Sequence, residues 1–290
     1  MIKTLGNNIV NAFTGGNSVK AIYTYGEKVW PTSGPEPTDY YIKWTPSDIS
    51  GIFTIAGEAR FLQSYNGYYN GPFSSRNVLE SGVGVPYYYI DKGAFVSTSI
   101  LTVETNIRFV SSFAFQGCSS LQTVRIPGRY VLNGAFRDCT ELQTISLPEL
   151  KNLHPFTFEG CTKLRYVYLP NVTVIGEDYA AFENCVNLLS VSLPKCKIID
   201  DYGMASCGIY EISLPEISRI NGYAFYSCSN LSTIYLGNTI PTLGDGVFQG
   251  TKITSSTGSI YVPISKLLAY KSASRWKYYS AIIQPIPPTP

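Results

Sequence analysis

A single repeated motif runs through most of this 290-residue chain. Six stretches follow the template A-F-x-x-C-x-x-L-x-x-I-x-L-P, and successive repeats begin 21 to 24 residues apart. Self-similarity with a period of about 20 to 50 residues is typical of a solenoid, in which each repeat forms one coil. The six stretches are AFQGCSSLQTVRIP, AFRDCTELQTISLP, TFEGCTKLRYVYLP, AFENCVNLLSVSLP, GMASCGIYEISLP and AFYSCSNLSTIYLG.

Apolar residues recur at fixed places in the repeat and define the expected core. The I-x-L-P stretch alternates apolar and polar residues, which predicts a half-buried strand, and the proline after it cannot continue the ladder. One coil cannot bury its apolar side chains alone, so each packs against its equivalent one coil away. We expect about eight coils over residues 90–263, forming a parallel β-sheet with short helical turns. The inward aromatic column is Phe95, Phe115, Phe136, Phe158, Phe182, Met204, Phe225 and Phe248.

The repeat strings resemble the BspA-like leucine-rich repeats of bacterial surface proteins. The similarity covers about residues 90–263, because the A-F-x-x-C and I-x-L-P elements stay in register through six strings. It implies a leucine-rich-repeat solenoid and, since such repeats occur in adhesins and other surface-exposed proteins, a binding function. One fold serves many partners, so the resemblance does not name a ligand.

Two repeats depart from the template. The sixth coil has Gly203-Met204 in place of Ala-Phe and is one residue shorter before Ile209, and the seventh ends in Gly237 instead of proline. Such irregularity is either drift that the packing tolerates, or a bend or contact in an otherwise uniform array.

Six of the seven cysteines form one column, three residues after the aromatic position. We expect a ladder of small buried thiols, since free cysteine behaves as a small hydrophobe. The odd number argues against a complete disulfide framework, although bridges between adjacent coils are an alternative. Cys196 lies outside the column and is expected to be the most exposed thiol.

The two ends of the chain read differently from the repeats. Residues 1–30 have a hairpin-like pattern with turn glycines, and residues 31–37 have linker composition. The V-K-x-I-Y-x-G-x-x-V-W type of pattern within 1–30 is similar to N-terminal segments of some bacteriophage virion and gut-bacterial proteins, which implies attachment to a larger particle. Residues 38–89 are expected to form a small β segment that caps the first coil, or an independent module.

Residues 264–290 are expected to form a helical C-terminal cap and an extended tail. A solenoid needs a cap to cover its last coil. The expected apolar face comprises Leu267, Leu268, Tyr270, Trp276, Tyr279, Ile282 and Ile283. A helix that lies on a membrane surface is the alternative.

Catalytic and cofactor motifs are missing from the sequence. It contains no G-x-S-x-G, H-E-x-x-H or P-loop pattern, and its single histidine, His154, precedes a proline in a predicted surface turn. We therefore predict no catalytic residues, cofactor or metal. No basic run suits nucleic acid, no apolar stretch is long enough to span a bilayer, and the first residues lack the apolar core of a secretory signal.

Polar positions between the core columns form the expected binding surface. On each predicted strand these residues face outward, and the outer sheet face is where such solenoids bind. Tyrosine and arginine are enriched at binding hot spots, although tyrosine also has a simple preference for strands. The candidate ligand-binding residues are Arg165, Tyr166, Tyr168, Tyr210, Glu211 and Tyr235.

These patterns favour a non-enzymatic binding or adhesion protein at a cell surface, in the extracellular space or on a virion. Its partner would be a protein or glycan on a host or neighbouring cell. A structural or assembly component of a phage virion or surface complex, docked through residues 1–30, is an alternative. A hydrolase acting on a surface polymer is a third possibility, which would require two carboxylates within general acid–base distance in a cleft.

Overall fold

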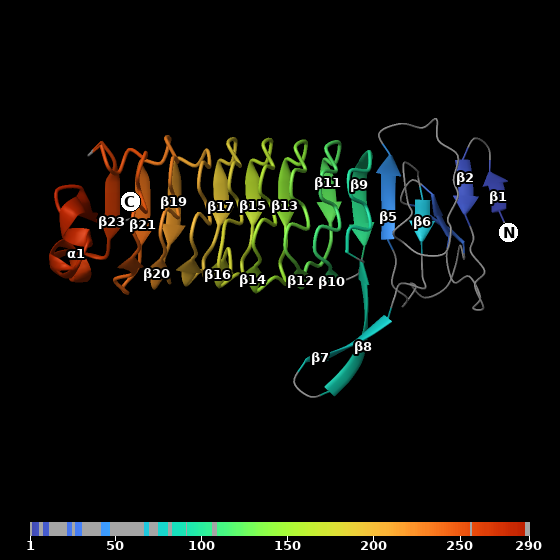
Figure 1. Cartoon of the computed structure of the whole chain (residues 1–290), viewed down its shortest axis with the longest axis horizontal. Helices are drawn as coiled ribbons and strands as arrows, with labels where there is room; N and C mark the ends of the chain where they lie inside the picture. The colour runs from blue at the N-terminus through green and yellow to red at the C-terminus, as the bar shows by residue number, and fades with distance from the viewer. Residues whose placement is uncertain are drawn as a thin grey trace.

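The repeats form a stack of about eight coils. The computed structural model describes residues 92–105, 109–255 and 257–287, together with the backbone of eight strands before residue 91. Figure 1 shows the coils in one row, with the N-terminal strands at one end and helix α1 (Leu267–Ser272) at the other. The sequence prediction of a leucine-rich-repeat solenoid is confirmed.

One strand per coil lies in a row that we call the front sheet. Its strands pair in parallel and in register in three separate ladders, so that in the middle ladder Ile145, Val167 and Val191 lie side by side. In β13 and β15 the central residue is buried and its two neighbours are exposed, as the alternating pattern predicts. The strands are β9 (Ile100–Thr105), β11 (Thr123–Arg125), β13 (Thr144–Ser146), β15 (Tyr166–Tyr168), β17 (Ser190–Ser192), β19 (Glu211–Leu214), β21 (Thr233–Leu236) and β23 (Ser259–Val262).

A second row of strands runs along another side of each coil. Its strands also pair in parallel, for example Ile175 with Ile199 and Ile199 with Ile220. These strands were not predicted from the sequence. The strands are β10 (Phe109–Val110), β12 (Tyr130–Val131), β14 (Asn152–Leu153), β16 (Val174–Ile175), β18 (Ile198–Ile199), β20 (Arg219–Ile220) and β22 (Thr242–Leu243).

The third side of each coil is a hydrogen-bonded turn, and we call the stack of these turns the turn wall. Within a turn the N–H groups of Gln116 and Cys118 donate to carbonyls three residues earlier. The intervening N–H groups donate to the next coil, as Phe115 does to Ala135 O at 2.8 Å. Backbone N–H groups alternate between an acceptor in the same coil and one in the next coil. The short helical turns predicted from the sequence are therefore single i to i+3 turns and do not extend into helices.

Aromatic rings fill the space between the three sides. Phe95, Phe115, Phe136, Phe158 and Phe182 stack in sequence, with centroids of neighbouring rings 5.0 to 5.7 Å apart and interplanar angles of 12° or less. The next place is taken by Met204, which is fully buried, and Phe225 stacks on Phe248 at 5.9 Å. The irregular sixth coil therefore keeps an apolar side chain in the column.

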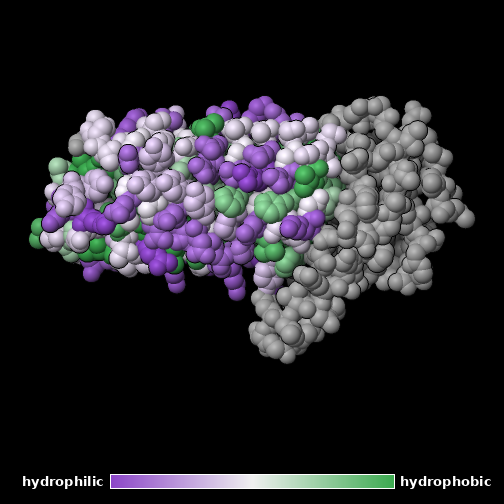
Figure 2. All heavy atoms as spheres, in the orientation of Figure 1, coloured by the Kyte–Doolittle hydropathy of each residue, from purple (hydrophilic) through white to green (hydrophobic). Residues whose placement is uncertain are grey.

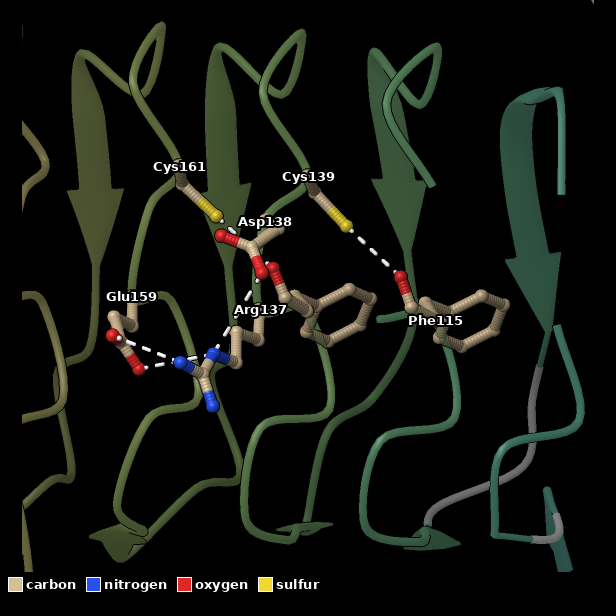
Figure 3. A network of polar contacts seen from close by, with 7 residues as sticks. Phe115, Arg137, Asp138, Cys139, Glu159 and Cys161 are labelled. Carbon is tan, nitrogen blue, oxygen red and sulfur yellow. Dashed lines mark hydrogen bonds and ion pairs between the residues drawn. The ribbon is translucent and has the colours of Figure 1, made fainter. Parts of the chain in front are cut away.

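The repeat cysteines form a ladder of thiol hydrogen bonds (Figure 3). Cys139 donates to Phe115 O at 3.2 Å, and Cys161 donates to Phe136 O at 3.1 Å. All six thiols make this bond to the preceding coil, and all seven cysteines of the chain are free and buried. The prediction of a buried thiol column is confirmed.

The prediction that Cys196 is the most exposed thiol is wrong, since its side chain is fully buried. It follows a front strand and occupies the place that Leu150, Val172 and Ile217 occupy in other coils, where an apolar side chain is buried in every case. The structure thus contains a further core column, in which cysteine is one of several small or medium apolar residues.

The N-terminal strands continue both rows. β5 (Ile42–Pro46) pairs antiparallel with β9 and with β6 (Gly67–Tyr69), while β8 (Val83–Ile90) pairs parallel with β10 and antiparallel with β7 (Ser75–Glu80). Figure 1 shows the β7–β8 hairpin projecting away from the stack. Two further antiparallel pairs are β1 (Ile2–Leu5) with β2 (Asn8–Asn11), and β3 (Ile22–Thr24) with β4 (Glu27–Trp30). The linker predicted at residues 31–37 lies outside the described residues, and the domain boundaries remain predictions.

The C-terminal segment covers the last coil. It comprises η2 (Ile264–Lys266), α1, η3 (Trp276–Tyr279) and β24 (Ile283–Pro285). Strand β24 pairs in parallel with β23 and was not predicted, since this region was expected to be a helical cap and an extended tail. Tyr270, Trp276, Ile282 and Ile283 are buried as predicted. The assignment of Leu268 to the buried face is wrong, since 81% of this side chain is exposed. α1 has six residues, and no helix in the described part of the chain is a candidate membrane span.

Candidate functional site

Strand β15 carries the most prominent exposed side chains of the front sheet. Tyr166 and Tyr168 are 53% and 51% exposed, on either side of the buried Val167. Their partners in register on β13 and β17 are short: Thr144 and Ser190 flank Tyr166, and Ser146 and Ser192 flank Tyr168. Because no long side chain stands beside them on either strand, both rings project above the surface of the sheet.

Arg165 precedes this pair and adds a positive charge. Its N–H donates to Gln143 O at 2.8 Å, and its carbonyl accepts from Leu189 N at 2.9 Å, so the backbone is held between two coils. The guanidinium is exposed and forms no ion pair with any described residue. By contrast, the neighbouring Lys163 is bound to Glu141 at 2.7 Å. Arg165, Tyr166 and Tyr168 form what we call the β15 patch.

The other three predicted residues lie farther along the sheet. Tyr210 is 52% exposed and immediately precedes β19, where Glu211 is also exposed. Tyr235, on β21, stacks on Tyr261 of β23 with centroids 5.1 Å apart. The sequence analysis missed Tyr261, whose signal was its place in the same column as Tyr235.

The hydrogen-bonded ladder of the front sheet is interrupted between these two sets of residues, as it also is between β11 and β13. β17 and β19 are not hydrogen-bonded neighbours, although β13–β17 and β19–β23 are each continuous ladders. The shortened sixth coil lies at this break: a Cβ on Gly208 would lie 2.2 Å from Val186 O, so only glycine fits there. The six predicted residues therefore share one face, with Arg165, Tyr166 and Tyr168 at one ladder and Tyr210, Glu211 and Tyr235 at the next.

His154 lies at the start of a turn, half-buried, as expected for a surface turn. Its Nδ1 is 2.7 Å from Glu177 Oε2 in the next coil, and its carbonyl accepts from Thr157 Oγ1 at 2.8 Å. Among the described residues, no group of three or more His, Cys, Asp or Glu side chains could hold a metal ion.

The repeat region matches one protein family. The family model of the BspA type leucine-rich repeat region matches residues 88–201 and 175–266, with six copies of the repeat. The chain belongs to the BspA-type leucine-rich repeat family. The match spans the front strands, the phenylalanine column and the cysteine column, which are therefore features of BspA-type coils in this chain. No curated protein matches the chain.

Several solved structures resemble this BspA-type chain. A leucine-rich repeat protein from Bacteroides ovatus is 19% identical over 64% of this chain and 61% of its own, with a TM-score of 0.37. A leucine-rich cell surface protein from Faecalibacterium prausnitzii is 24% identical over 57% and 47%, with a TM-score of 0.48. A leucine-rich repeat protein from T. pallidum is 28% identical over 41% and 68%, with a TM-score of 0.37. The chain thus spans less than two thirds of the first two relatives.

On the face seen in Figure 2, apolar side chains lie in small separate groups among hydrophilic ones. A surface of this kind suits a contact built from a few aromatic anchors within a polar surround, which is the usual anatomy of a non-obligate interface.

Proposed function

We propose that this BspA-type protein is a non-enzymatic binding protein that acts at a cell surface and recognises a protein or glycan through the β15 patch. The observation that carries the proposal is the pair of tyrosine rings, each about half exposed, that project between serine and threonine side chains. Both rings are carried by one strand of the sheet, so little conformational entropy is lost when they bind a ligand.

The chemistry of the patch fits a polar ligand with apolar faces. Tyrosine offers a ring for packing and a hydroxyl for hydrogen bonding, and among the described residues neither Tyr166 nor Tyr168 uses its hydroxyl internally. The unpaired Arg165 can bind a carboxylate or another anionic group in a bidentate manner. Leu189, which is 36% exposed on the adjacent coil, extends the apolar part. A protein loop and an acidic glycan both match this combination.

The double variant Tyr166→Ala with Tyr168→Ala tests the proposal. Both side chains are exposed, so the fold is expected to persist, whereas loss of two anchors is expected to weaken binding by at least about thirtyfold, or roughly 2 kcal/mol. Binding is measured with the purified full chain on glycan arrays and on host-surface proteins, and then by calorimetry with the best ligand.

Tyr278→Ala is the matched control, because Tyr278 is 77% exposed on the C-terminal cap, far along the chain from the patch. It is expected to bind as the unmodified protein does. If the double variant also retained full affinity for every ligand of the unmodified protein, the β15 patch would be excluded as the binding surface.

A further inference from the structure

A row of aromatic rings runs along the outside of the turn wall. Phe156, Tyr179, Tyr202 and Tyr223 follow one another on four consecutive coils, with successive centroids 5.4, 5.7 and 5.1 Å apart. Tyr226 stands edge-on to Tyr202 and Tyr223, at 6.4 and 5.9 Å. Tyr179 and Tyr226 are 42% and 36% exposed, so the row is open to solvent and separate from the buried phenylalanine column.

Folding does not require rings at these positions. Phe156, Tyr202 and Tyr223 have φ angles of 56° to 60°, a left-handed conformation that bulky residues rarely adopt. The equivalent places in other coils are held by Gly134 and Gly246, with φ angles of 61°. Glycine thus builds the same turn without strain, and the rings are additions to a turn that forms without them.

The turn wall is also strongly acidic. In its last six turns, residues 132–138, 154–160, 176–184, 200–206, 221–227 and 244–250, there are eight carboxylates and a single arginine, although the whole chain has a net charge of +2. Asp178 and Asp201 are exposed and form no ion pair with any described residue. The carboxylates are Asp138, Glu159, Glu177, Asp178, Glu183, Asp200, Asp201 and Asp245.

One contact within the chain shows what this wall accommodates. Arg137 lies with its guanidinium 5.4 Å from the centre of the Phe156 ring, at the end of the aromatic row. The same guanidinium forms an ion pair with Glu159, with Nε 3.1 Å from Oε2 (Figure 3). The Arg137 cation is thus held by an aromatic ring and a carboxylate together. The turns of the next three coils also carry aromatic rings, and two of them carry carboxylates, but they contain no Lys or Arg.

We propose that the turn wall from Phe156 to Tyr226 binds a lysine- or arginine-rich segment of another protein. Cationic side chains would lie against the tyrosine rings and pair with carboxylates such as Asp178 and Asp201, as Arg137 does with Phe156 and Glu159. The carboxylates do not converge in threes among the described residues, which suits several separate cations better than one metal ion. Four coils span roughly 15 Å, the length of four to five extended residues. This surface is distinct from the β15 patch, and the proposal does not depend on it.

Binding of a fluorescein-labelled arginine homopeptide to the full chain, measured by anisotropy at about 0.15 M salt, tests the proposal. Tyr202→Gly with Tyr223→Gly removes two rings and installs the residue that other coils use, so folding is expected to be unharmed. Asp178→Asn with Asp201→Asn removes two unpaired charges. Each pair is expected to weaken binding about tenfold. Glu141→Gln with Glu216→Gln, which changes the net charge equally outside the turn wall, is expected to have no effect.

Four outcomes would overturn the proposal. The first is unchanged affinity of the ring variant. The second is an equal loss of affinity in the Glu141 and Glu216 control, which would show that only the net charge of the protein matters. The third is equal binding of a neutral glycine–serine peptide. The fourth is a salt-sensitive dimer of the protein alone, seen by ultracentrifugation and abolished by the ring variant, which would make a second copy the occupant. Circular dichroism and urea unfolding confirm that each variant is folded.

Discussion

At the scale of the residue, the cysteine column couples burial to hydrogen bonding. Each thiol donates to the carbonyl of the aromatic residue, or of Met204, in the preceding coil, and desolvation raises the pKa of Cys118 to about 11 and of Cys196 to about 12. The pKa values of Cys139, Cys185 and Cys207 also lie well above 9.0, for the same reason. These five thiols therefore remain protonated. At the two ends of the column, Thr98 and Thr251 occupy the same place, and their hydroxyls donate to the carbonyls of Phe95 and Phe248.

We predict that alkaline pH unfolds this protein. In the unfolded chain the thiols lose protons near pH ~8.5. Burial raises the folded-state pKa of six of them, so unfolding releases protons above that pH; the six are Cys118, Cys139, Cys161, Cys185, Cys196 and Cys207. The stabilisation is complete below pH ~8.5 and is lost as pH rises towards the folded-state values, by about 1.4 kcal/mol per pH unit for each of these thiols. Urea unfolding midpoints between about pH 7.5 and 10.5 measure this slope.

Cys161→Ser provides the control for this effect. It keeps a hydrogen-bond donor in the column but removes one titrating thiol, so unfolding at alkaline pH is expected to release one proton fewer. The stability at neutral pH is expected to fall, because the hydroxyl oxygen is smaller than the sulfur and fills the site less well. A midpoint that stays constant up to pH ~10 would contradict the assigned pKa directions.

At the scale of the element, the cap shows how a short segment closes a repeat array. The Tyr270 hydroxyl donates to Gly237 O and Thr239 O at 3.0 and 2.6 Å, and Trp276 Nε1 donates to Pro241 O at 2.7 Å. The carbonyls that end the seventh coil thus find donors in the cap. Gly237 replaces the usual proline because a Cβ there would lie 1.8 Å from Pro215 O. This departure from the template therefore marks a close contact.

Trp276→Ala is expected to lower the free energy of unfolding by about 3–5 kcal/mol, because it empties a fully buried site and leaves the Pro241 carbonyl without its donor. Tyr270→Phe, which removes only a hydroxyl, is expected to cost about 1–2 kcal/mol. Both values come from urea unfolding monitored by circular dichroism, with the exposed Leu268→Ala expected to change stability by less than about 0.5 kcal/mol. Equal effects of all three substitutions would mean that the cap is not docked as described.

Elements with a regular column were predictable from sequence, and the others were not. The front strands and the phenylalanine and cysteine columns recur with one residue type at one spacing, so they stand out without a structure. The second-row strands have two residues each, too few to show alternation. The column of Cys196 varies among leucine, valine, cysteine and isoleucine, and its burial was missed.

The candidate site was predictable only in part. Outward-facing positions followed from the strand pattern, and Tyr166, Tyr168 and Tyr210 are exposed as expected. The division of the front sheet into ladders was not predictable, because the break between β17 and β19 is a property of the backbone at the shortened sixth coil. The ring row of the turn wall was missed because its column alternates between glycine and aromatic residues, which conceals the shared left-handed backbone.

At the scale of the whole molecule, each coil contacts mainly its neighbours, so the array is expected to tolerate removal of one complete coil. Deleting residues 140–161 joins Cys139 to Thr162 in register, since Cys139 and Cys161 occupy equivalent places. The product is expected to unfold cooperatively and to be shorter by about 4.8 Å, as measured by small-angle X-ray scattering.

The control for the deletion is the removal of residues 140–150, which takes out half a coil and puts the phenylalanine and cysteine columns out of register. This shorter deletion is expected to abolish the cooperative transition although it removes fewer residues. A stable product from it, or an aggregated product from the full-coil deletion, would show that the coils are not interchangeable units.

The acidity of the turn wall also affects how the molecule meets charged surroundings. The last six turns carry seven negative charges net, and the rest of the chain carries nine positive ones. The negative charge of the protein is therefore concentrated on one wall of the stack. Near an anionic surface, repulsion of this wall favours orientations in which the acidic side faces away before any contact forms, so that diffusion delivers the protein already oriented.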